Sequence, residues 1–210
     1  IYLYEYGIKD AMPLDSALIK NKSFTFKGFQ ESPVLRMLTF SEGTIDKDAY
    51  FHFAGFTPYS LWFVLDHSKL KVEIAENSSV TGSPENEDLT AYMRKMDKLE
   101  NEAEKIDEDA ENSEEQYNQI FSKRETISKD FIQHHNNSLV AASMFYNLRH
   151  SLSEEDRRRI IDNAGDTFKS APNIDKVIDH LAVLDKVAIG KQFTDFKMAD
   201  TKDNIHNLSE

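Results

Sequence analysis

The chain has 210 residues, of which 40% are hydrophobic, enough for one large or two small domains with hydrophobic cores. Its 37 acidic and 25 basic residues leave a net charge of −12, which argues against nucleic acid or an anionic membrane surface as the main partner. The absence of Cys excludes dithiol chemistry, disulfides and thiolate metal sites from these residues.

Residues 1–82 have the pattern of a small β-domain. Gly and Pro recur at short intervals, and hydrophobic and polar residues alternate between them with the two-residue period of a strand. This alternation occurs in segments 1–4, 23–29, 34–40, 50–53 and 70–74, while the continuous apolar run 61–65 predicts a strand covered on both faces. We expect an antiparallel β-sandwich or open barrel. Because the alternation is already under way at Ile1, we expect a first strand to be missing, which would leave an edge unpaired.

Residues 83–188 predict an all-helical segment of about five helices. No Gly occurs from 83 to 164 and no Pro from 85 to 171, while apolar residues recur every three or four positions. Residues typical of helix starts mark where the helices begin: Pro84, Ser113 with Gln116, Ser138, Ser153 with Asp156, and Asn173. We expect the first two helices to form an antiparallel pair, the fourth to extend to Phe168 and the fifth to stop at Gly190. The sequence therefore predicts the α+β class.

The first helix and its turn carry much of the charge. Residues 85–115 include thirteen acidic and four basic side chains. We interpret this stretch as an exposed helical face, with an acidic binding surface as the alternative.

Residues 189–210 predict a β-hairpin. Phe193, Phe196 and Met198 indicate the first strand, and a second strand begins at Ile205. Asp203 and Asn204 predict the turn, since Asp and Asn accept the positive φ that tight hairpin turns need. Ser209 stands where the N-cap of a following helix would lie. A two-stranded hairpin is marginally stable in water, so we expect this segment to belong to a larger unit.

This hairpin resembles the entry into the thioredoxin-like domain of the TlpA/ResA type of thiol-disulfide oxidoreductase. The residues that match the family's opening are Gly190, Phe193, Asp195, Phe196, Met198, Ile205, Leu208 and Ser209. Asn204 stands where the family usually has Gly, and the W-C-x-x-C active site is not among these residues. The start of the chain resembles the N-terminal domain of unknown function that precedes thioredoxin-like domains in Bacteroidetes cell-envelope proteins, through segments 14–17, 23–28 and 82–86.

The resemblance implies three parts: a β-sandwich-like domain over 1–82, a helical segment over 83–188, and the opening hairpin of a truncated thioredoxin-like domain over 189–210. It implies a non-catalytic region of an oxidoreductase of the periplasm or cell envelope, which docks, dimerises or spaces the redox domain. Its partners would be substrate proteins of that domain or a second copy, and it would reach a membrane only through an anchor outside this chain. The alternative is a stand-alone envelope module that binds a ligand or protein, with no redox domain.

We assign no catalytic, cofactor-binding or metal-binding residue from the sequence, no cofactor is expected, and the binding residues stay unknown. His134 and His135 are adjacent, so on a helix they point about 100° apart and cannot share a metal as an i, i+4 pair can. The other His are isolated from ligand-spaced partners: His52, His67, His150, His180 and His206. A hydrolase that uses His and carboxylates is a further alternative, but the sequence contains no Gly-x-Ser-x-Gly motif to support it.

Three further patterns each have a structural explanation and a functional alternative. Arg157, Arg158 and Arg159 follow acidic residues 154–156 at ion-pair spacing on a helix, and the alternative is a phosphate or partner patch. The aromatics of segment 50–62 predict core packing or the lining of a pocket. Segment 15–17 is an Asp-Ser-Ala triplet, which is typical of a turn into a strand and also resembles a bacterial O-glycosylation sequon.

Overall fold

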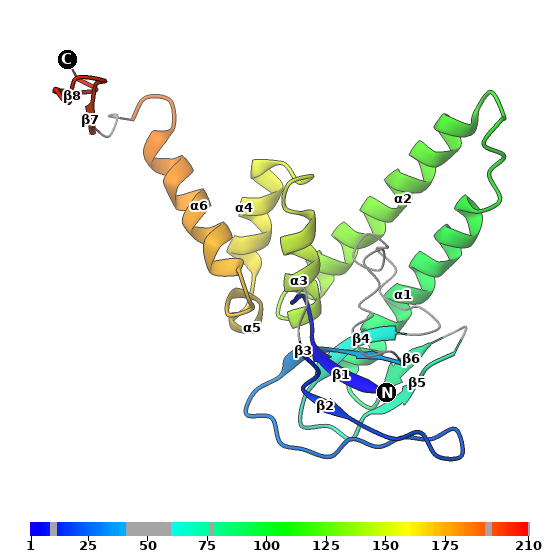
Figure 1. The fold of residues 1–210 in the computed structure, drawn as a ribbon. Helices are drawn as coiled ribbons and strands as arrows, with labels where there is room; N and C mark the ends of the chain where they lie inside the picture. Colours follow the sequence, from blue (N-terminus) through cyan, green and yellow to red (C-terminus); the bar gives the residue numbers. More distant parts are fainter. Residues whose placement is uncertain (9–11, 41–59, 76–77, 192–194, 210) are drawn as a thin grey trace.

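The computed structural model describes residues 1–8, 12–40, 60–75, 78–191 and 195–209, in which strands are followed by helices and then by a final strand pair (Figure 1). The strands are β1 (Tyr2–Glu5), β2 (Asp15–Ser16), β3 (Val34–Thr39), β4 (Ser60–Leu65), β5 (Lys71–Glu73), β6 (Ser79–Thr81), β7 (Lys197–Ala199) and β8 (Ile205–Asn207). The helices are α1 (Pro84–Ala103), α2 (Ser113–His134), α3 (Leu139–Leu148), α4 (Glu154–Asn163), α5 (Asp166–Lys169) and α6 (Ile174–Val187). This order confirms the predicted α+β class, with open antiparallel sheets.

The main sheet is antiparallel with the order β2-β1-β3-β4, and β5 and β6 form a separate two-stranded sheet. β1 pairs with β2 on one side and β3 on the other. The expectation of an unpaired edge at the first strand is therefore wrong, because the short β2 returns along it. In the β3–β4 ladder Met37 lies opposite Trp62 and Leu38 opposite Leu61, so neighbouring residues face opposite sides of the sheet.

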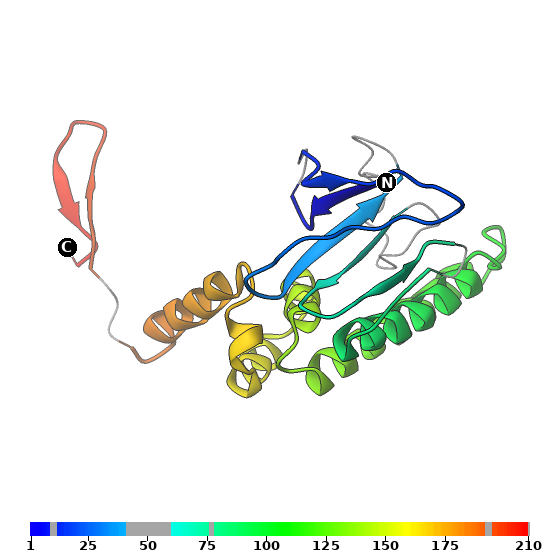
Figure 2. The ribbon, with the colours of Figure 1, turned by 90° about the horizontal axis from the view of Figure 1, so that it is seen from below.

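Both faces of the main sheet are covered, and β4 lies at the centre of the packing. Trp62 and Val64 belong to a core that includes buried residues of all six helices described. Leu61 and Phe63 point to the other face, where they pack with Val80 of β6. Figure 2 shows the helices lying along one side of the sheet. The apolar run 61–65 is thus covered on both faces, as predicted, and the helical segment packs directly on the sheet.

One predicted strand does not form. Segment 23–29 contributes only an isolated bridge between Lys20 and Ser23, across a turn at Asn21 and Lys22 with positive φ. Two of its three rings pack against the sheet as part of an irregular segment, since Phe24 and Phe26 contact the second core, while Phe29 is exposed. Alternation thus predicted the partial burial of Phe24 and Phe26 but not strand pairing. Segment 50–53 lies outside the described residues.

Two of the predicted helix starts have the expected side-chain caps. The Ser138 and Ser153 side chains accept backbone N–H bonds from Ala141 and Asp156. At α2, however, Asn112 is the N-cap residue, and its side chain accepts a 2.9 Å bond from the Gln116 amide. The helix therefore starts with an Asn112–Gln116 side-chain pair, and its N-cap lies one residue before the predicted Ser113.

The predicted fourth helix is divided in two. α4 ends at Asn163, and Phe168 lies on the separate one-turn helix α5, which follows Gly165. At Gly165 an added Cβ would lie 2.3 Å from the Asn137 side chain, so the chain passes too close to that residue for a larger one. The described part therefore has six helices.

Two parts project from the packed body (Figure 1). The outer halves of α1 and α2 form an antiparallel arm, and α6 extends in another direction with the β7–β8 hairpin beyond its end. Both views show the hairpin apart from the rest of the chain (Figures 1 and 2). Among the described helices, none is long and apolar enough to cross a membrane.

Candidate functional site

The step from β6 into α1, residues 82–86, joins the sheets to the helices. Gly82 has a φ of +107°, and an added Cβ would lie 2.5 Å from the Lys69 carbonyl oxygen, so this position requires Gly. Pro84 occupies the first turn of α1, where a missing N–H leaves no helix bond unmade. A Ser or Asn at such a step can satisfy free N–H groups of the helix start. In the structure Ser83 makes no side-chain cap, and Asn86 acts on the sheet instead.

Asn86 and Thr90 on α1 form hydrogen bonds with strand backbone groups, as a neighbouring strand would. The Asn86 side chain accepts a 2.9 Å bond from the Val64 N–H and donates a 2.8 Å bond to the Val64 carbonyl at the free edge of β4. One turn later, the Thr90 hydroxyl accepts from the Val80 N–H at 3.1 Å and donates to its carbonyl at 2.9 Å. All four residues are buried. α1 therefore satisfies the edge groups of both sheets, which would otherwise be buried and unpaired.

Glu85 links residues 82–86 to α3 by hydrogen bonds. Its carboxylate accepts bonds from the Ser138 hydroxyl at 2.5 Å and the Val140 N–H at 3.1 Å, at the N-terminus of α3. A carboxylate is favourable there because the first N–H groups of a helix carry partial positive charge. Residues 82–86 thus connect β4, β5–β6, α1 and α3, and this geometry is that of a structural junction.

The C-terminal helix α6 is anchored along most of its length. Ile174, Val177 and Leu181 are buried in the main core, and Leu184 packs against it. Arg158 of α4 contacts the Asp185 carboxylate at 3.0 Å and donates to the Leu181 carbonyl at 3.4 Å. The residues of α6 after Asp185 are exposed, so only the C-terminal end of the helix is free.

The hairpin beyond α6 presents apolar side chains to solvent. Phe196, Met198, Ile205 and Leu208 are each more than half exposed. The pairing sets Met198 opposite His206, and the Leu208 N–H donates to the Phe196 carbonyl. Of the described residues, only β7 and β8 form this sheet. A two-stranded sheet with exposed apolar residues lacks the cover that such sheets need in water.

Local polar bonds hold the hairpin at both ends. At its base the Asp195 carboxylate accepts bonds from the Ser209 N–H at 3.1 Å and its hydroxyl at 2.9 Å. Ser209 thus closes the hairpin at its base, and its role as the N-cap of a following helix stays a prediction. At the turn, Asp203 has the predicted positive φ of 63°.

The turn also orders Asp200. The side-chain amide and backbone N–H of Asn204, with the Lys202 N–H, bond the Asp200 carboxylate and lower its pKa to about 2. His206 contacts the same carboxylate at 3.3 Å. The hairpin therefore folds through its own contacts even though its apolar face is uncovered.

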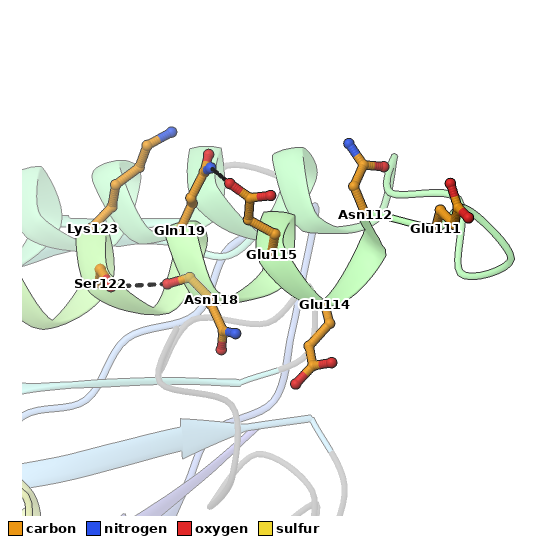
Figure 3. A pocket seen from close by; sticks show the side chains of 8 residues that line it. All are labelled: Glu111, Asn112, Glu114, Glu115, Asn118, Gln119, Ser122 and Lys123. Atoms are coloured by element: carbon orange, nitrogen blue, oxygen red, sulfur yellow. Dashed lines mark hydrogen bonds between the residues drawn. The ribbon is translucent and has the colours of Figure 1, made fainter.

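The acidic stretch and the start of α2 form an open surface without a catalytic arrangement. A shallow pocket is lined by residues of the turn and of the start of α2, and Figure 3 shows their side chains pointing outward from the backbone. The bonds are short-range: the Gln119 amide donates to Glu115 at 3.4 Å, and the Ser122 hydroxyl donates to the Asn118 carbonyl at 2.9 Å. Most acidic residues of 85–115 are exposed, but those of 104–112 lie in the turn between α1 and α2, so the predicted exposed face is helical only in part.

The described His residues do not converge. His134 contacts the Asp130 carbonyl at 2.7 Å, while His135 stacks on Phe131 and lies 3.3 Å from Asp88. His67 contacts the Gln30 carbonyl, and His206 belongs to the hairpin. Over the described ranges, no group of three His, Asp or Glu side chains is placed to hold a metal ion. His52 lies outside these ranges.

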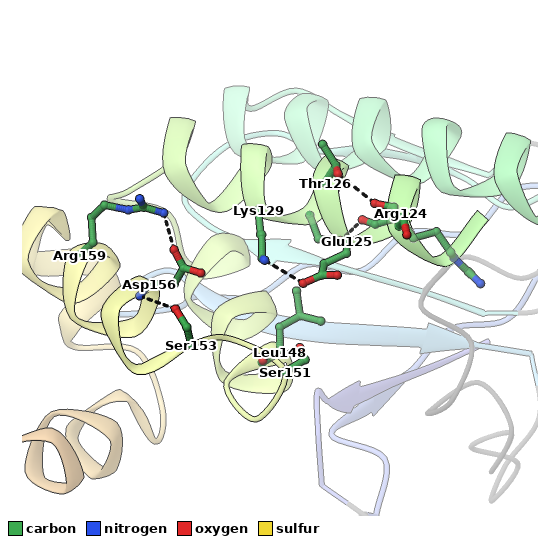
Figure 4. Close-up of polar contacts among 11 residues, drawn as sticks. Arg124, Glu125, Thr126, Lys129, Leu148, Ser151, Ser153, Asp156 and Arg159 are labelled. Atoms are coloured by element: carbon green, nitrogen blue, oxygen red, sulfur yellow. Dashed lines mark hydrogen bonds and ion pairs between the residues drawn. The ribbon is translucent and has the colours of Figure 1, made fainter. Parts of the chain in front are cut away.

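All three arginines of the triplet 157–159 bond other groups of the chain, and two of them form ion pairs along α4. Arg159 pairs with Asp156 at 2.5 Å, and Asp156 donates its N–H to the Ser153 hydroxyl at 3.0 Å (Figure 4). Arg158 pairs with Glu154 as well as Asp185, and Arg157 donates to the Arg149 carbonyl. These contacts match the ion-pair spacing in the sequence and add one link to α6.

Two titratable groups on α1 have shifted pKa values without forming a site. Burial raises the pKa of the Tyr92 hydroxyl, which bonds Ser128 at 2.9 Å. Burial, followed by the nearby Glu100 carboxylate, raises the pKa of Asp97. They lie on one helix five residues apart, and Tyr92 is enclosed in the core, so they indicate packing and not acid–base catalysis.

For two of the predicted patterns, the aromatics of 50–62 and the triplet 15–17, the structure indicates no binding site in the residues it describes. The aromatics of segment 50–59 lie outside the described residues, and Trp62 stacks on Tyr6 within the core at a centroid distance of 4.9 Å. Asp15 and Ser16 form the short exposed strand β2, as a turn into a strand would predict. No binding role follows from either.

Comparison with known proteins recognises the first part of the chain. Residues 1–89 match a family model described as a domain of unknown function (DUF4369). No curated protein and no solved structure matches the chain significantly. The predicted resemblance of the N-terminal part to a domain of unknown function is thereby confirmed, and its link to a redox enzyme stays a prediction. The matched region extends into α1 and includes Asn86, so it reaches past the junction.

Sequence reasoning missed the roles of Asn86, Thr90 and Glu85. The signal was present in part, since Asn86 and Thr90 are polar residues near the apolar stripe of α1 that begins at Leu89. A polar residue on a buried helix face needs a partner, but the sequence does not say which strand supplies it.

Proposed function

We propose that this chain is a non-catalytic scaffold that positions a thioredoxin-like redox domain in a cell-envelope thiol-disulfide oxidoreductase. The observation that carries this proposal is the β7–β8 hairpin, which is ordered by its own polar bonds yet leaves Phe196, Met198 and Leu208 exposed. Such a hairpin suits the first piece of a larger sheet, which would cover these side chains.

The rest of the chain supports a positioning role. α6 is fixed to the body by its buried face and by Arg158, so a domain built on the hairpin would be held at a defined place. The absence of Cys leaves these residues without a thiolate, the nucleophile that disulfide exchange requires. By resemblance, the first Cys of a C-x-x-C pair in the redox domain would attack a substrate disulfide, and the second would resolve the mixed disulfide. The dithiol would be oxidised as the substrate is reduced.

The reading frame beyond Glu210 tests the proposal directly. An in-frame W-C-x-x-C after the hairpin is the expected result, and a stop codon immediately after Glu210 would contradict it. Insulin-disulfide reduction provides the functional test: the polypeptide with that motif should reduce insulin, whereas residues 1–210 should not. Reduction of insulin by residues 1–210 alone would contradict the proposal that this region is non-catalytic.

The second candidate is a stand-alone envelope binding module. Large apolar side chains of the β-domain are strongly exposed, namely Met12, Leu18 and Phe29 at 80%, 81% and 83%. Exposed apolar residues of this size are found at interaction sites. A stop codon after Glu210, together with a measurable partner of the β-domain, would favour this candidate.

A further inference from the structure

Val183 and Val187 lie on the C-terminal part of α6, and Ile189 lies in the turn just after the helix. Each of these three side chains, together called the stripe, is more than half exposed. Val183 and Val187 are one turn apart and share a helix face. Val183 and Leu181 are two positions apart, or about 200° around the helix, so Val183 points away from the core that buries Leu181. The stripe therefore lies on the side of α6 that the described body does not cover.

We propose that this stripe is the docking face for the redox domain that the hairpin opens. The inference rests on the proposed function and names the partner of the same site. It predicts that the redox domain packs against the last two turns of α6 and does not move independently on its linker.

The short connection favours a tethered partner. Six residues, 190–195, join Ile189 to Phe196. They span at most roughly 20 Å when extended. Val183 lies four residues, or about 6 Å, before the end of α6 at Val187, and Ile189 follows two residues later, at most about 7 Å further on. Any domain built on β7 and β8 is therefore within reach of the whole stripe, at an effective concentration on the order of millimolar.

The size of the stripe argues against a second copy as the occupant. Stable protein–protein interfaces bury about 1,200–2,000 Å² in total. Three aliphatic side chains supply a small part of such an area. A contact this small suits a partner that is already held nearby, because the tether removes most of the cost of bringing two molecules together.

The test uses the full-length polypeptide, after its reading frame has shown the redox domain. The variant V183K/V187K places charges on the stripe, and Lys suits the C-terminal turns of a helix, so α6 should remain folded. The control A182K adds the same charge to an exposed position about 100° away around the helix. Circular dichroism confirms that both variants retain their helices.

The readout is ¹⁵N relaxation, which reports whether two domains tumble together. The wild type and A182K should each show one correlation time for both parts, and V183K/V187K should show a separate, shorter one for the redox domain. Two correlation times in the wild type would overturn the docking inference and leave the proposed function standing. Concentration-dependent dimers in sedimentation, lost in V183K/V187K, would overturn it in favour of a second copy. A reading frame without a redox domain would instead overturn the proposed function.

Discussion

The junction at residues 82–86 and the hairpin at residues 195–209 are both short turn-containing segments, but their polar groups bond in opposite ways. At the junction, Asn86 and Glu85 bond backbone groups more than twenty residues away, and Asn86 is completely buried. In the hairpin, Asp195 and Asp200 bond residues within fourteen positions, and the apolar side chains face solvent. The junction links the sheets and helices of the packed body. The hairpin, by contrast, has its polar groups hydrogen-bonded but leaves its apolar side chains uncovered.

The largest effect should come from Asn86→Leu. This change removes both partners of the Val64 backbone groups, and each buried group left unpaired costs about 1–3 kcal/mol. We expect the free energy of unfolding to fall by about 3 kcal/mol in urea denaturation followed by circular dichroism. The control Asn101→Leu changes an exposed Asn of the same helix and should stay within about 0.5 kcal/mol of wild type. Equal stability of the two variants would show that α1 does not close the sheet edge.

Gly82→Ala should have the next largest effect. It combines a strained φ of +107° with a Cβ 2.5 Å from the Lys69 carbonyl oxygen, so we expect a loss of about 2 kcal/mol. Gly28→Ala is the matched control, because nothing lies within 4 Å of its added Cβ. Thermal unfolding measures the loss of stability in each variant. Equal stability of Gly82→Ala and Gly28→Ala would contradict the close approach of residue 82 to the Lys69 carbonyl.

Removal of the hairpin should leave the body nearly unchanged. A chain ending at Ile189 retains the buried residues of both cores, so its free energy of unfolding should differ from that of the whole by less than about 0.5 kcal/mol. Urea denaturation of the two chains measures this difference. A larger loss would mean that the hairpin packs on the body, which would remove the contrast between the two segments.

The smallest effect should be the response of the hairpin turn to acid. The pKa of Asp200 is lowered from 3.8 to about 2, so its carboxylate stabilises the folded turn above pH 3.8. That contribution is lost as the pH falls through about 2, because the carboxylate is then protonated in the folded turn as well. Backbone amide shifts of Lys202 and Asn204 should move together over this range in NMR titration, and they should be flat in Asp200→Asn. Movement centred near pH 4 would show that the carboxylate is not held by the turn.

Local sequence signals predicted most elements and failed where a partner decides the outcome. The caps at Ser138 and Ser153 act within a few residues and were predicted correctly. Segment 23–29 alternates like a strand, but strand formation needs a neighbouring strand with free backbone groups, and this segment packs its rings without one. The role of Asn86 was missed because its bonds go to Val64, 22 residues earlier in the chain. The role of Ser209 was missed because its partner Asp195 is reached only when the hairpin has formed.

The sequence by itself determined the α+β order, the doubly covered strand β4, the apolar faces of the helices and the hairpin with its Asp turn. These features follow from side-chain periodicity and backbone preferences, which act over a few residues. Only the tertiary structure decided that the helices pack on the sheet, that α1 closes two sheet edges and that α6 holds the hairpin clear of the body. These depend on which distant surfaces meet, and burial leaves each polar group at such a contact dependent on a specific partner.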